Sequence, residues 1–367
     1  VGELADNPEL RDKLRTSFSG ISDMERLMTR IAYSTANAKE LKSLQQTVQR
    51  LPQIKSLLAG CQSALLKDIS GSIDPLEDVE DLIGRAISEE PPLTVREGGM
   101  IKSGYNEQVD ELRSVMEDGA GVVAAIEARQ REETGIPKLK VGYNRVFGYY
   151  IEVTNSYKDM VPETYIRKQT LTNCERYITQ ELKELEGKIV GAKDRSVALE
   201  YQVFCSVRET ISRETQRIQK TAKALAVLDT LASLAEAAAT NNYCCPQIST
   251  NGVIDIKDGR HPVVEAIMNG APFVPNDTVL DTSDNRCMII TGPNMAGKST
   301  YMRQIALIVI MAQIGSFVPA RSADIGIVDA VFTRVGAADD LATGRSTFMV
   351  EMSEVSDILK NLSLIHI

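Results

Sequence analysis

Apolar residues recur along the first part of this chain with the period of helices. Within positions 41–58, and again within 109–126, they return at intervals of three or four residues, which places them on one face of a helix. Pro52 lies inside the first stripe. Because proline lacks a backbone donor and clashes with the preceding turn, we expect a kink or a division there. Pro-Pro at 91–92 and Gly-Gly at 98–99 predict a connection between the two stripes.

The period then shortens to two. Apolar and aromatic residues mostly alternate with others over 141–153, which is typical of strands, so a small β-rich insert is predicted to begin near Pro137. The helical period returns from about Thr172 and continues to about Thr240. Long helices that lead into a small β unit and out of it predict an antiparallel helix pair with the β unit at its end.

The composition shifts again after Pro246. Short apolar runs at 253–256, 288–290 and 331–332 predict strands, and a helix is predicted over 299–315. The order strand, loop, helix, strand is typical of α/β nucleotide-binding domains.

Charge and cysteine usage narrow the function classes. The net charge of −9 argues against a uniformly basic nucleic-acid binder, and no apolar run reaches the roughly 18 residues that span a membrane. Residues 138–195 nevertheless carry eleven Lys or Arg against eight Asp or Glu, so this segment can meet phosphate. A solvated face of paired helical charges explains the same balance. The six cysteines form no CxxC pair and only two histidines are present, so we predict neither zinc nor disulfides, and reduced thiols in the cytoplasm.

The segment 292–299 reads GPNMAGKS and fits the phosphate-loop pattern G-x-x-x-x-G-K-[ST] in full. Its glycines allow a sharp turn in which backbone N–H groups point at phosphate oxygens, and the following helix N-terminus adds partial positive charge. Lys298 can place its ammonium on the β and γ phosphates, and Ser299 can offer its hydroxyl to Mg²⁺. The loop therefore predicts that a nucleoside triphosphate is bound, but it does not say what the energy is used for.

Several longer motifs make the sequence resemble the MutS family of DNA mismatch-repair ATPases, in its bacterial branch. The resemblance runs from about residue 20 to residue 361. It covers the phosphate loop with its flanks, three further ATPase segments and two clamp segments. The motifs are TGPNMAGKSTYMR at 291–303, RVGAADD at 334–340, GRSTFMVEM at 344–352, GRHPVV at 259–264, KVGYNRVFGYYI at 140–151 and RKQTLTN at 167–173.

This resemblance implies a multidomain architecture. It implies a helical lever over 1–136, a β-rich clamp insert over 137–190 that closes over DNA, returning lever helices over 191–245, and an α/β P-loop ATPase domain of the ABC type over 246–367, incomplete at its C-terminus. The implied partners are mismatched duplex DNA, a second copy that completes two ATP sites, and a downstream ATPase of the MutL type. The implied cofactors are ATP and Mg²⁺, and the implied location is the bacterial cytoplasm, at the nucleoid.

The resemblance also implies roles for individual residues. Phe273 stacks on adenine, Asn294 lies near the γ-phosphate and the attacking water, and Ser346 reaches the γ-phosphate of the partner subunit. The alternatives are that Phe273 is core and that Ser346 only caps the helix predicted from 347. His261 is interpreted as a structural turn residue. The implied ATP contacts are Phe273, Gly292, Pro293, Asn294, Met295, Ala296, Gly297, Lys298, Ser299 and Thr300, with Asn294, Lys298 and Ser346 catalytic and Ser299 on the metal. The implied DNA contacts are Arg167, Lys168, Gln169, Asn173 and Arg176.

Two expected features of the family are missing from the sequence. No Phe is followed by Glu two places later, so the mismatch-reading wedge is absent and this chain is not expected to discriminate mismatches alone. No Asp-Glu pair follows Glu354, so we expect the chain to bind ATP but to hydrolyse it poorly. The alternative functions are a coiled-coil ABC ATPase of the SMC kind, which would show sustained heptads, and a non-catalytic DNA-binding scaffold.

Overall fold

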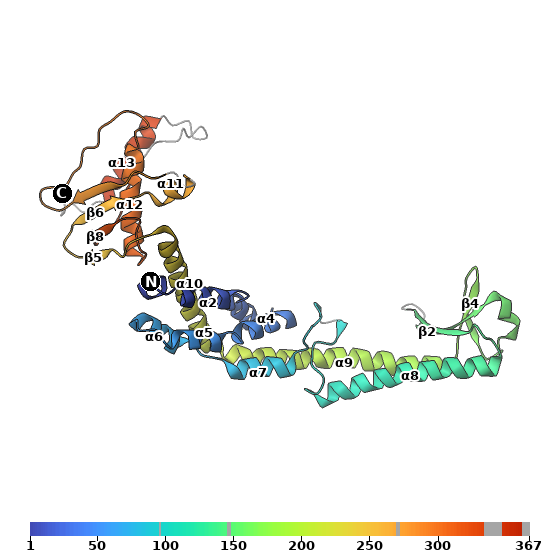
Figure 1. The fold of residues 1–367 in the computed structure, drawn as a ribbon. Helices are drawn as coiled ribbons and strands as arrows, with labels where there is room; N and C mark the ends of the chain where they lie inside the picture. Colours follow the sequence, from blue (N-terminus) through green and yellow to red (C-terminus); the bar gives the residue numbers. More distant parts are fainter. Residues whose placement is uncertain (95–96, 145–147, 269–271, 334–346, 362–367) are drawn as a thin grey trace. The chain divides into compact units, whose positions relative to one another are not determined.

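A computed structural model describes most of the chain as two compact units built from helices and two small sheets (Figure 1). Unit 1 comprises Val1–Phe18, Leu57–Ile69 and Ala226–Ile367, and unit 2 comprises Ser19–Ser56 and Ser70–Leu225. The residues that the structure describes are 1–94, 97–144, 148–268, 272–333 and 347–361.

The first helical stripe is divided, as the position of Pro52 predicts. Helix α4 (Ala38–Val48) ends and α5 (Leu51–Leu58) begins within a few residues, with Pro52 in the first turn of α5, where a helix needs no donor. Leu44 and Ile54 are fully buried. The neighbouring helices are α3 (Met24–Ala32), α6 (Ala64–Ser72) and α7 (Glu77–Ala86).

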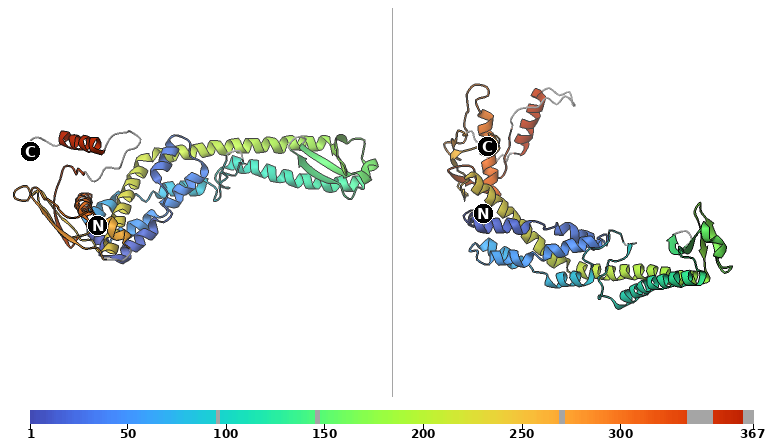
Figure 2. Two further views of the ribbon diagram at one scale, coloured as in Figure 1. Left: turned by 90° about the horizontal axis from the view of Figure 1, so that it is seen from above. Right: turned by 45° about the vertical axis from the view of Figure 1, so that its right-hand side comes forward.

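Unit 2 contains the predicted antiparallel helix pair. Helices α8 (Glu107–Thr134) and α9 (Gln180–Arg213) lie side by side in all three ribbon views (Figures 1 and 2). The prediction of one continuous buried stripe on α8 is wrong in its middle. Val115 and Val122 are 46% and 45% exposed. A helical period places residues on one face, but it does not determine how closely the neighbouring helix covers them.

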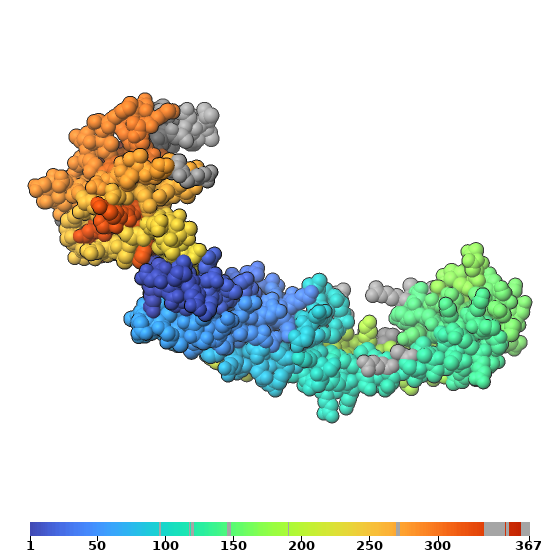
Figure 3. Space-filling model, viewed as in Figure 1, coloured from blue at the N-terminus to red at the C-terminus, as the bar shows by residue number. Residues whose placement is uncertain are grey.

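A four-stranded antiparallel sheet connects the two long helices, in the order β1-β2-β4-β3. Ile151 and Tyr177 of this sheet pack against Ile126 of α8 and Leu182 of α9, so the sheet and the helix ends share one core. Side chains of this region form one continuous mass in the space-filling view (green in Figure 3). The strands are β1 (Lys140–Asn144), β2 (Gly148–Thr154), β3 (Ile166–Thr170) and β4 (Cys174–Ile178), with a 3-10 helix, η2 (Asn155–Met160), between β2 and β3.

The return to helix lies later in the chain than the sequence pattern predicts. The expectation of a helix from about Thr172 is wrong, because residues 174–178 form strand β4 and pair on both sides. Helix α9 begins only after Thr179, whose side chain caps it by accepting the N–H of Leu182 at 3.3 Å. These five residues form a strand because the neighbouring strands pair with them, and a local sequence pattern contains no information about such neighbours.

Unit 1 joins N-terminal helices to the chain after residue 226. Helix α2 (Pro8–Phe18) is tied to α10 (Thr215–Asn241) by Arg11 Nε and Glu236 at 2.7 Å, and Arg15 reaches the same carboxylate at 2.8 Å. The short helix α1 (Gly2–Ala5) precedes them and buries Leu4. The helical period to about Thr240 is thus confirmed, in two helices rather than one.

The second sheet lies in unit 1 and is mixed, in the order β5-β8-β6-β7. Strand β6 (Ile254–Gly259) is antiparallel to β7 (Asn276–Leu280) and β8 (Ser322–Gly326), whereas β5 (Gln247–Ser249) is parallel to β8. Helix α12 (Lys298–Gln313) covers it, with Ile308 against Ile256 and Ile325. The predicted strand at 253–256 and the predicted helix at 299–315 are confirmed; α11 (Pro262–Ile267) and α13 (Thr347–Asn361) complete the unit.

Two other predicted strands are wrong. The runs 288–290 and 331–332 are described, and neither forms a strand. Ile289 is 86% exposed. A strand needs a neighbour for its ladder, and neither run pairs with a strand of the sheet. The expected order of strand, loop, helix and strand is present, but it is formed by β7, the phosphate loop, α12 and β8 rather than by the two predicted runs.

Two general features complete the description. All six cysteines are free thiols. Among the helices that the structure describes, none has the length and hydropathy to cross a membrane.

Candidate functional site

The phosphate-loop segment runs directly into the N-terminus of α12. Gly297 is the N-cap, with φ 85° and ψ 5°, a left-handed conformation that favours glycine. The first intrahelical bond of the helix is made by the Tyr301 amide, so the amides of Lys298, Ser299 and Thr300 precede it and have no helical acceptor. A hollow of about 280 Å³ lies over this turn, and it is lined by Asn294, Met295, Ala296, Gly297, Lys298, Ser299 and Thr300.

Lys298 folds back over the loop that precedes it. Its Nζ donates to the carbonyl of Gly292 at 2.6 Å and to the carbonyl of Pro293 at 2.7 Å. An ammonium has three donors, so one remains for an anion in the hollow. The two carbonyls hold the charge at the mouth of the turn, beside the free amides of α12. The site thus concentrates positive charge where an oxyanion would sit.

The remaining polar side chains of the loop are exposed. The Asn294 amide and the Ser299 hydroxyl make no hydrogen bond within the described residues, and both remain available to a ligand. Met295 is fully exposed with φ 64°, an uncommon conformation for a residue with a Cβ. A hydroxyl beside phosphate oxygens is a set that Mg²⁺ accepts, because this ion keeps several waters. In the described parts of the chain, no three His, Cys, Asp or Glu side chains gather into a metal site.

Of the predicted nucleotide contacts outside the phosphate loop, the structure describes Phe273 but not Ser346. Ser346 lies outside the described residues. Phe273 is half-buried in the segment before β7. Tyr301, in the first turn of α12, donates to the carbonyl of Asp277 at 3.0 Å and bonds Thr278 at 2.8 Å. These bonds tie the start of β7 to the start of α12, so Phe273 lies within four residues, or about 14 Å of chain, of that junction.

His261 is structural, as interpreted from the sequence. It is 6% exposed and caps α11, with Nδ1 accepting the Val264 N–H at 3.3 Å. Burial lowers its pKa, which favours the neutral form that can accept this bond. Its neighbour Arg260 donates to the carbonyls of Asn241 and Asn242 at 3.0 and 2.9 Å, closing the C-terminal end of α10. Arg260 and His261 of the GRHPVV segment therefore both stabilise the fold.

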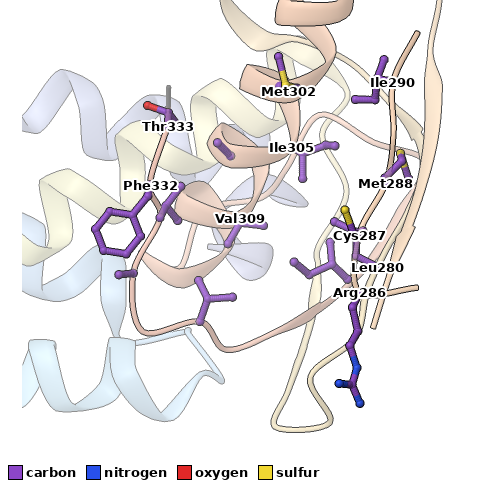
Figure 4. A pocket seen from close by; sticks show the side chains of 15 residues that line it. Leu280, Arg286, Cys287, Met288, Ile290, Met302, Ile305, Val309, Phe332 and Thr333 are labelled. Carbon is purple, nitrogen blue, oxygen red and sulfur yellow. The ribbon is translucent and has the colours of Figure 1, made fainter. Parts of the chain in front are cut away.

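An apolar cleft lies between α12 and the sheet, with Ile254 of β6 and Leu280 of β7 in its lining (Figure 4). It measures about 520 Å³. Met302, Ile305 and Val309 of α12 face it from one side and Met288 and Ile290 from the other. The exposed run 288–290 is thus part of the cleft wall rather than of a sheet.

Unit 2 brings three of the predicted DNA contacts to one edge of its sheet. Arg167 and Lys168 lie on the edge strand β3, and Asn173 lies in the turn that joins β3 to β4; all three are exposed. The ladder is irregular between Arg167 and Gln169, so Lys168 has no partner residue on β4. The side chain of Arg167 is 63% exposed and 3.3 Å from the Glu175 carboxylate, a contact that solvent weakens.

The other two predicted DNA contacts are engaged within the sheet. Arg176 bonds Glu152 at 3.0 Å and Gln169 at 3.1 Å, and its guanidinium lies 4.3 Å from the centre of the Tyr150 ring. The hydrogen bond with Glu152 raises the pKa of Arg176. Arg176 and Gln169 therefore brace the sheet, and a DNA contact would have to compete with these bonds. The sequence pattern does not show this, because the pairing of β2 with β4 creates it.

Two protein-family models match the parts of the chain that carry these sites. The family model described as MutS domain V matches residues 288–365, and that described as MutS family domain IV matches residues 104–195. A DNA mismatch repair protein MutS of Lachnoclostridium phytofermentans is 57% identical over 361 residues, which is 98% of this chain. The chain belongs to the MutS family.

Two further MutS relatives show the same extent of similarity. The proteins of Acetivibrio thermocellus and Methanosarcina mazei, both named DNA mismatch repair protein MutS, are 55% and 53% identical over 98% and 99% of this chain. The chain spans about two fifths of the length of these relatives, 39% to 42%. The domain IV match covers α8, the four-stranded sheet and the first half of α9, and the domain V match covers the phosphate loop and α12.

The MutS fold also uses residues that sequence reasoning did not select. Tyr301 and Arg260 are two of them, and Gln304 of α12 is a third: it is fully buried, and neither polar atom of its side chain has a hydrogen-bond partner among the described residues. A Cβ at Gly259 would lie 2.7 Å from its Nε2, so this glycine makes room for the amide. Only the spacing from Lys298 could have pointed to Gln304 in the sequence. It places Gln304 about two turns into the helix, on a buried face.

Proposed function

We propose that this chain is the DNA-holding and nucleotide-binding portion of a DNA mismatch repair protein that binds mismatched duplex DNA and switches with ATP. The observation that carries the proposal is the turn over α12, where free amides and the Lys298 ammonium face one hollow. The similarity to proteins named DNA mismatch repair protein MutS supports the repair function. The heptads expected of an SMC-type ATPase are absent from the sequence, so that alternative is not favoured.

The nucleotide half of the proposal assigns ATP to the hollow at 294–300. The amides and Lys298 bind phosphate, Ser299 holds Mg²⁺, Phe273 stacks on adenine, and Asn294 lies near the attacking water. Ser346 would act on the ATP of a second copy, so the ATP-binding domains would work as a homodimer. When bound, Mg²⁺ neutralises phosphate charge; weak hydrolysis by this chain stays a prediction.

The ATP half is tested by titrating labelled ATP into the chain. Lys298→Ala should weaken binding about tenfold or more, because it removes the one side-chain cation of the hollow. Lys13→Ala is the matched control, since Lys13 is exposed and pairs with Glu9 on its own helix. Equal binding by the Lys298 variant and the control would overturn the assignment.

The DNA half assigns the exposed edge of the unit 2 sheet to the phosphate backbone. Arg167, Lys168 and Asn173 would hold DNA without reading its sequence, because phosphate contacts position a protein but do not specify bases. Gln169 and Arg176 would contribute mainly by bracing the sheet. Partnership with a MutL-type ATPase, and a place at the bacterial nucleoid in the cytoplasm, belong to the same proposal.

Duplex-DNA binding as a function of salt tests this half. The double variant Arg167→Ala/Lys168→Ala should weaken binding and reduce the slope of log affinity against log salt by about one to two. Arg213→Ala is the control, because Arg213 is exposed and pairs with Glu209 within α9. An unchanged slope in the double variant would remove these two residues from the interface.

A further inference from the structure

Three charged side chains are buried in the described part of the chain, and they differ in how they are paired. Lys42, 8% exposed, pairs with Glu89 at 2.8 Å. Glu200, 2% exposed, pairs with Arg113 at 2.9 Å. Arg208, also 8% exposed, forms no ion pair with any described residue. Buried charges are normally paired, so the exception points to a missing partner.

The bonds that Arg208 does make leave most of its guanidinium unused. Nη1 donates to the carbonyl of Ala36 at 3.3 Å, and Nη2 lies 3.6 Å from the Cys205 sulfur, a weak acceptor. The ring of Phe204 is 5.4 Å away. A guanidinium has five N–H donors, so these contacts satisfy the smaller part of its capacity.

Arg208 lines a hollow of about 200 Å³ within unit 2. Its walls come from α9, from the turn before α4 and from the connection between α7 and α8. Among the described residues that line it none is acidic, and Arg208 is the one charged side chain. The lining comprises Ser34, Thr35, Ala36, Asn37, Ala38, Pro92, Leu93, Thr94, Met100, Tyr201, Phe204 and Arg208.

The N-terminus of α4 adds positive potential to the same hollow. Asn37 and Ala38 line the hollow, and α4 has 11 residues. The Asn37 side chain accepts the Glu40 amide at 2.9 Å, and Glu40 accepts the Asn37 amide in return. This cap leaves the Ala38 and Lys39 amides without acceptors among the described residues. Glu40 lies in the first turn of α4 and pairs with Arg30 at 2.8 Å, so α4 adds the dipoles of two free amides, and Arg208 is the cation of the hollow that has no counter-ion among the described residues.

We propose that this hollow receives the carboxylate of an acidic side chain from a partner protein. Its volume suits one side chain and is below the range of about 300–1,000 Å³ usual for cofactor pockets. One cation does not suit a DNA backbone, which is held by several. The rim favours a peptide, because Leu93 and Tyr201 are 67% and 42% exposed and can cover apolar neighbours of the acid.

Synthetic peptides test the chemistry directly. An array of peptides is used, each with one glutamate between varied apolar residues, together with counterparts in which glutamine replaces it. The labelled chain should prefer the glutamate members by about tenfold or more, since a buried charge pair is involved. Arg208→Met should abolish the preference and Arg208→Lys should retain part of it. Arg213→Met, on the same helix but exposed, is the control and should change nothing.

Thermal unfolding separates binding from folding. Arg208→Met breaks no ion pair, so it should unfold at or above the temperature of the unchanged chain. A clearly lower temperature would assign Arg208 to the fold and overturn the proposal. So would equal retention of glutamate and glutamine peptides. Free acetate binding as tightly as the peptides would overturn the partner-protein part, and displacement of the peptides by inorganic phosphate alone would overturn the carboxylate part.

Discussion

Arg113, which is half-buried, and Glu200, which is buried, form an ion pair at 2.9 Å that joins α8 to α9. The same carboxylate accepts the backbone N–H of Met100 at 2.7 Å, and Arg113 donates to the carbonyl of Ile101 at 2.7 Å. Two long helices and the connection before α8 therefore meet at one carboxylate. At the other end of this helix pair, Arg129 of α8 forms an ion pair with Glu181 of α9. There the two helices share a core with the four-stranded sheet.

Glu200→Gln should loosen this junction. Loss of the charge weakens the bonds to Arg113 and to the Met100 amide, and a charged hydrogen bond contributes about 1.5–3 kcal/mol. We expect hydrogen exchange at the amides of Met100 and Ile101 to quicken by at least about tenfold. Glu209→Gln, an exposed carboxylate on the same helix, is the control. Unchanged protection at Met100 would show that the carboxylate does not hold the connection.

Alanine at the mid-helix glycines of the pair should stiffen it. A Cβ at Gly121 or at Gly191 would meet no atom within 4 Å, so no packing requires glycine there. Each replacement should stabilise its helix by about 0.5–1 kcal/mol and slow hydrogen exchange around it. Gly148→Ala is the contrasting variant: at φ 76° its Cβ would overlap the Glu186 carboxylate, so we expect a loss of stability. Faster exchange in the Gly121 and Gly191 variants would contradict this reasoning.

The stability of unit 1 should decline in mild acid through His261. Burial lowers its pKa from the ordinary value of 6.5, so the unfolded chain binds the proton more readily than the folded one. The stabilisation is complete above pH 6.5 and is lost as the pH falls below it towards the lower folded value, because the protonated ring cannot accept the Val264 N–H. His261→Asn keeps an acceptor that does not titrate. The thermal unfolding temperature should therefore fall more steeply through mild acid in the unchanged chain than in the His261→Asn variant; parallel curves would rule the histidine out.

Tyr301→Phe should weaken nucleotide binding without touching the hollow. The hydroxyl holds the start of β7 against α12 through Asp277 and Thr278, and each such bond contributes about 1 kcal/mol. Labelled ATP should bind a few-fold more weakly because the adenine side of the site moves relative to the phosphate side. Thr278→Val removes one of the two bonds and should give a smaller loss. A Tyr301 variant that binds like the unchanged chain would separate β7 from the ATP site.

Much of the helical architecture was predictable from local pattern. The division at Pro52, the helix after the phosphate loop and the structural role of His261 follow from rules that act over a few residues: proline lacks a donor, free amides begin a helix, and a short polar ring caps one. The GPNMAGKS segment belongs to this class, because its turn depends on Gly297 and on the helix that follows.

What the local pattern missed depends on residues far apart in the chain. The run 174–178 becomes a strand because β2 and β3 pair with it, whereas 288–290 pairs with no strand and lines the cleft beside α12. Arg176 reads as a free cation in the sequence, yet Glu152 and Gln169 engage it across the sheet. Arg208 reads as one more basic residue on a helix, and burial beside Ala36 makes it an unpaired charge. The sequence by itself determined most of the helices, the phosphate loop and the family. Tertiary structure decided which charged side chains form ion pairs within the fold and which remain unpaired, because ladder bonds, burial and counter-ions come from residues that are distant in the chain.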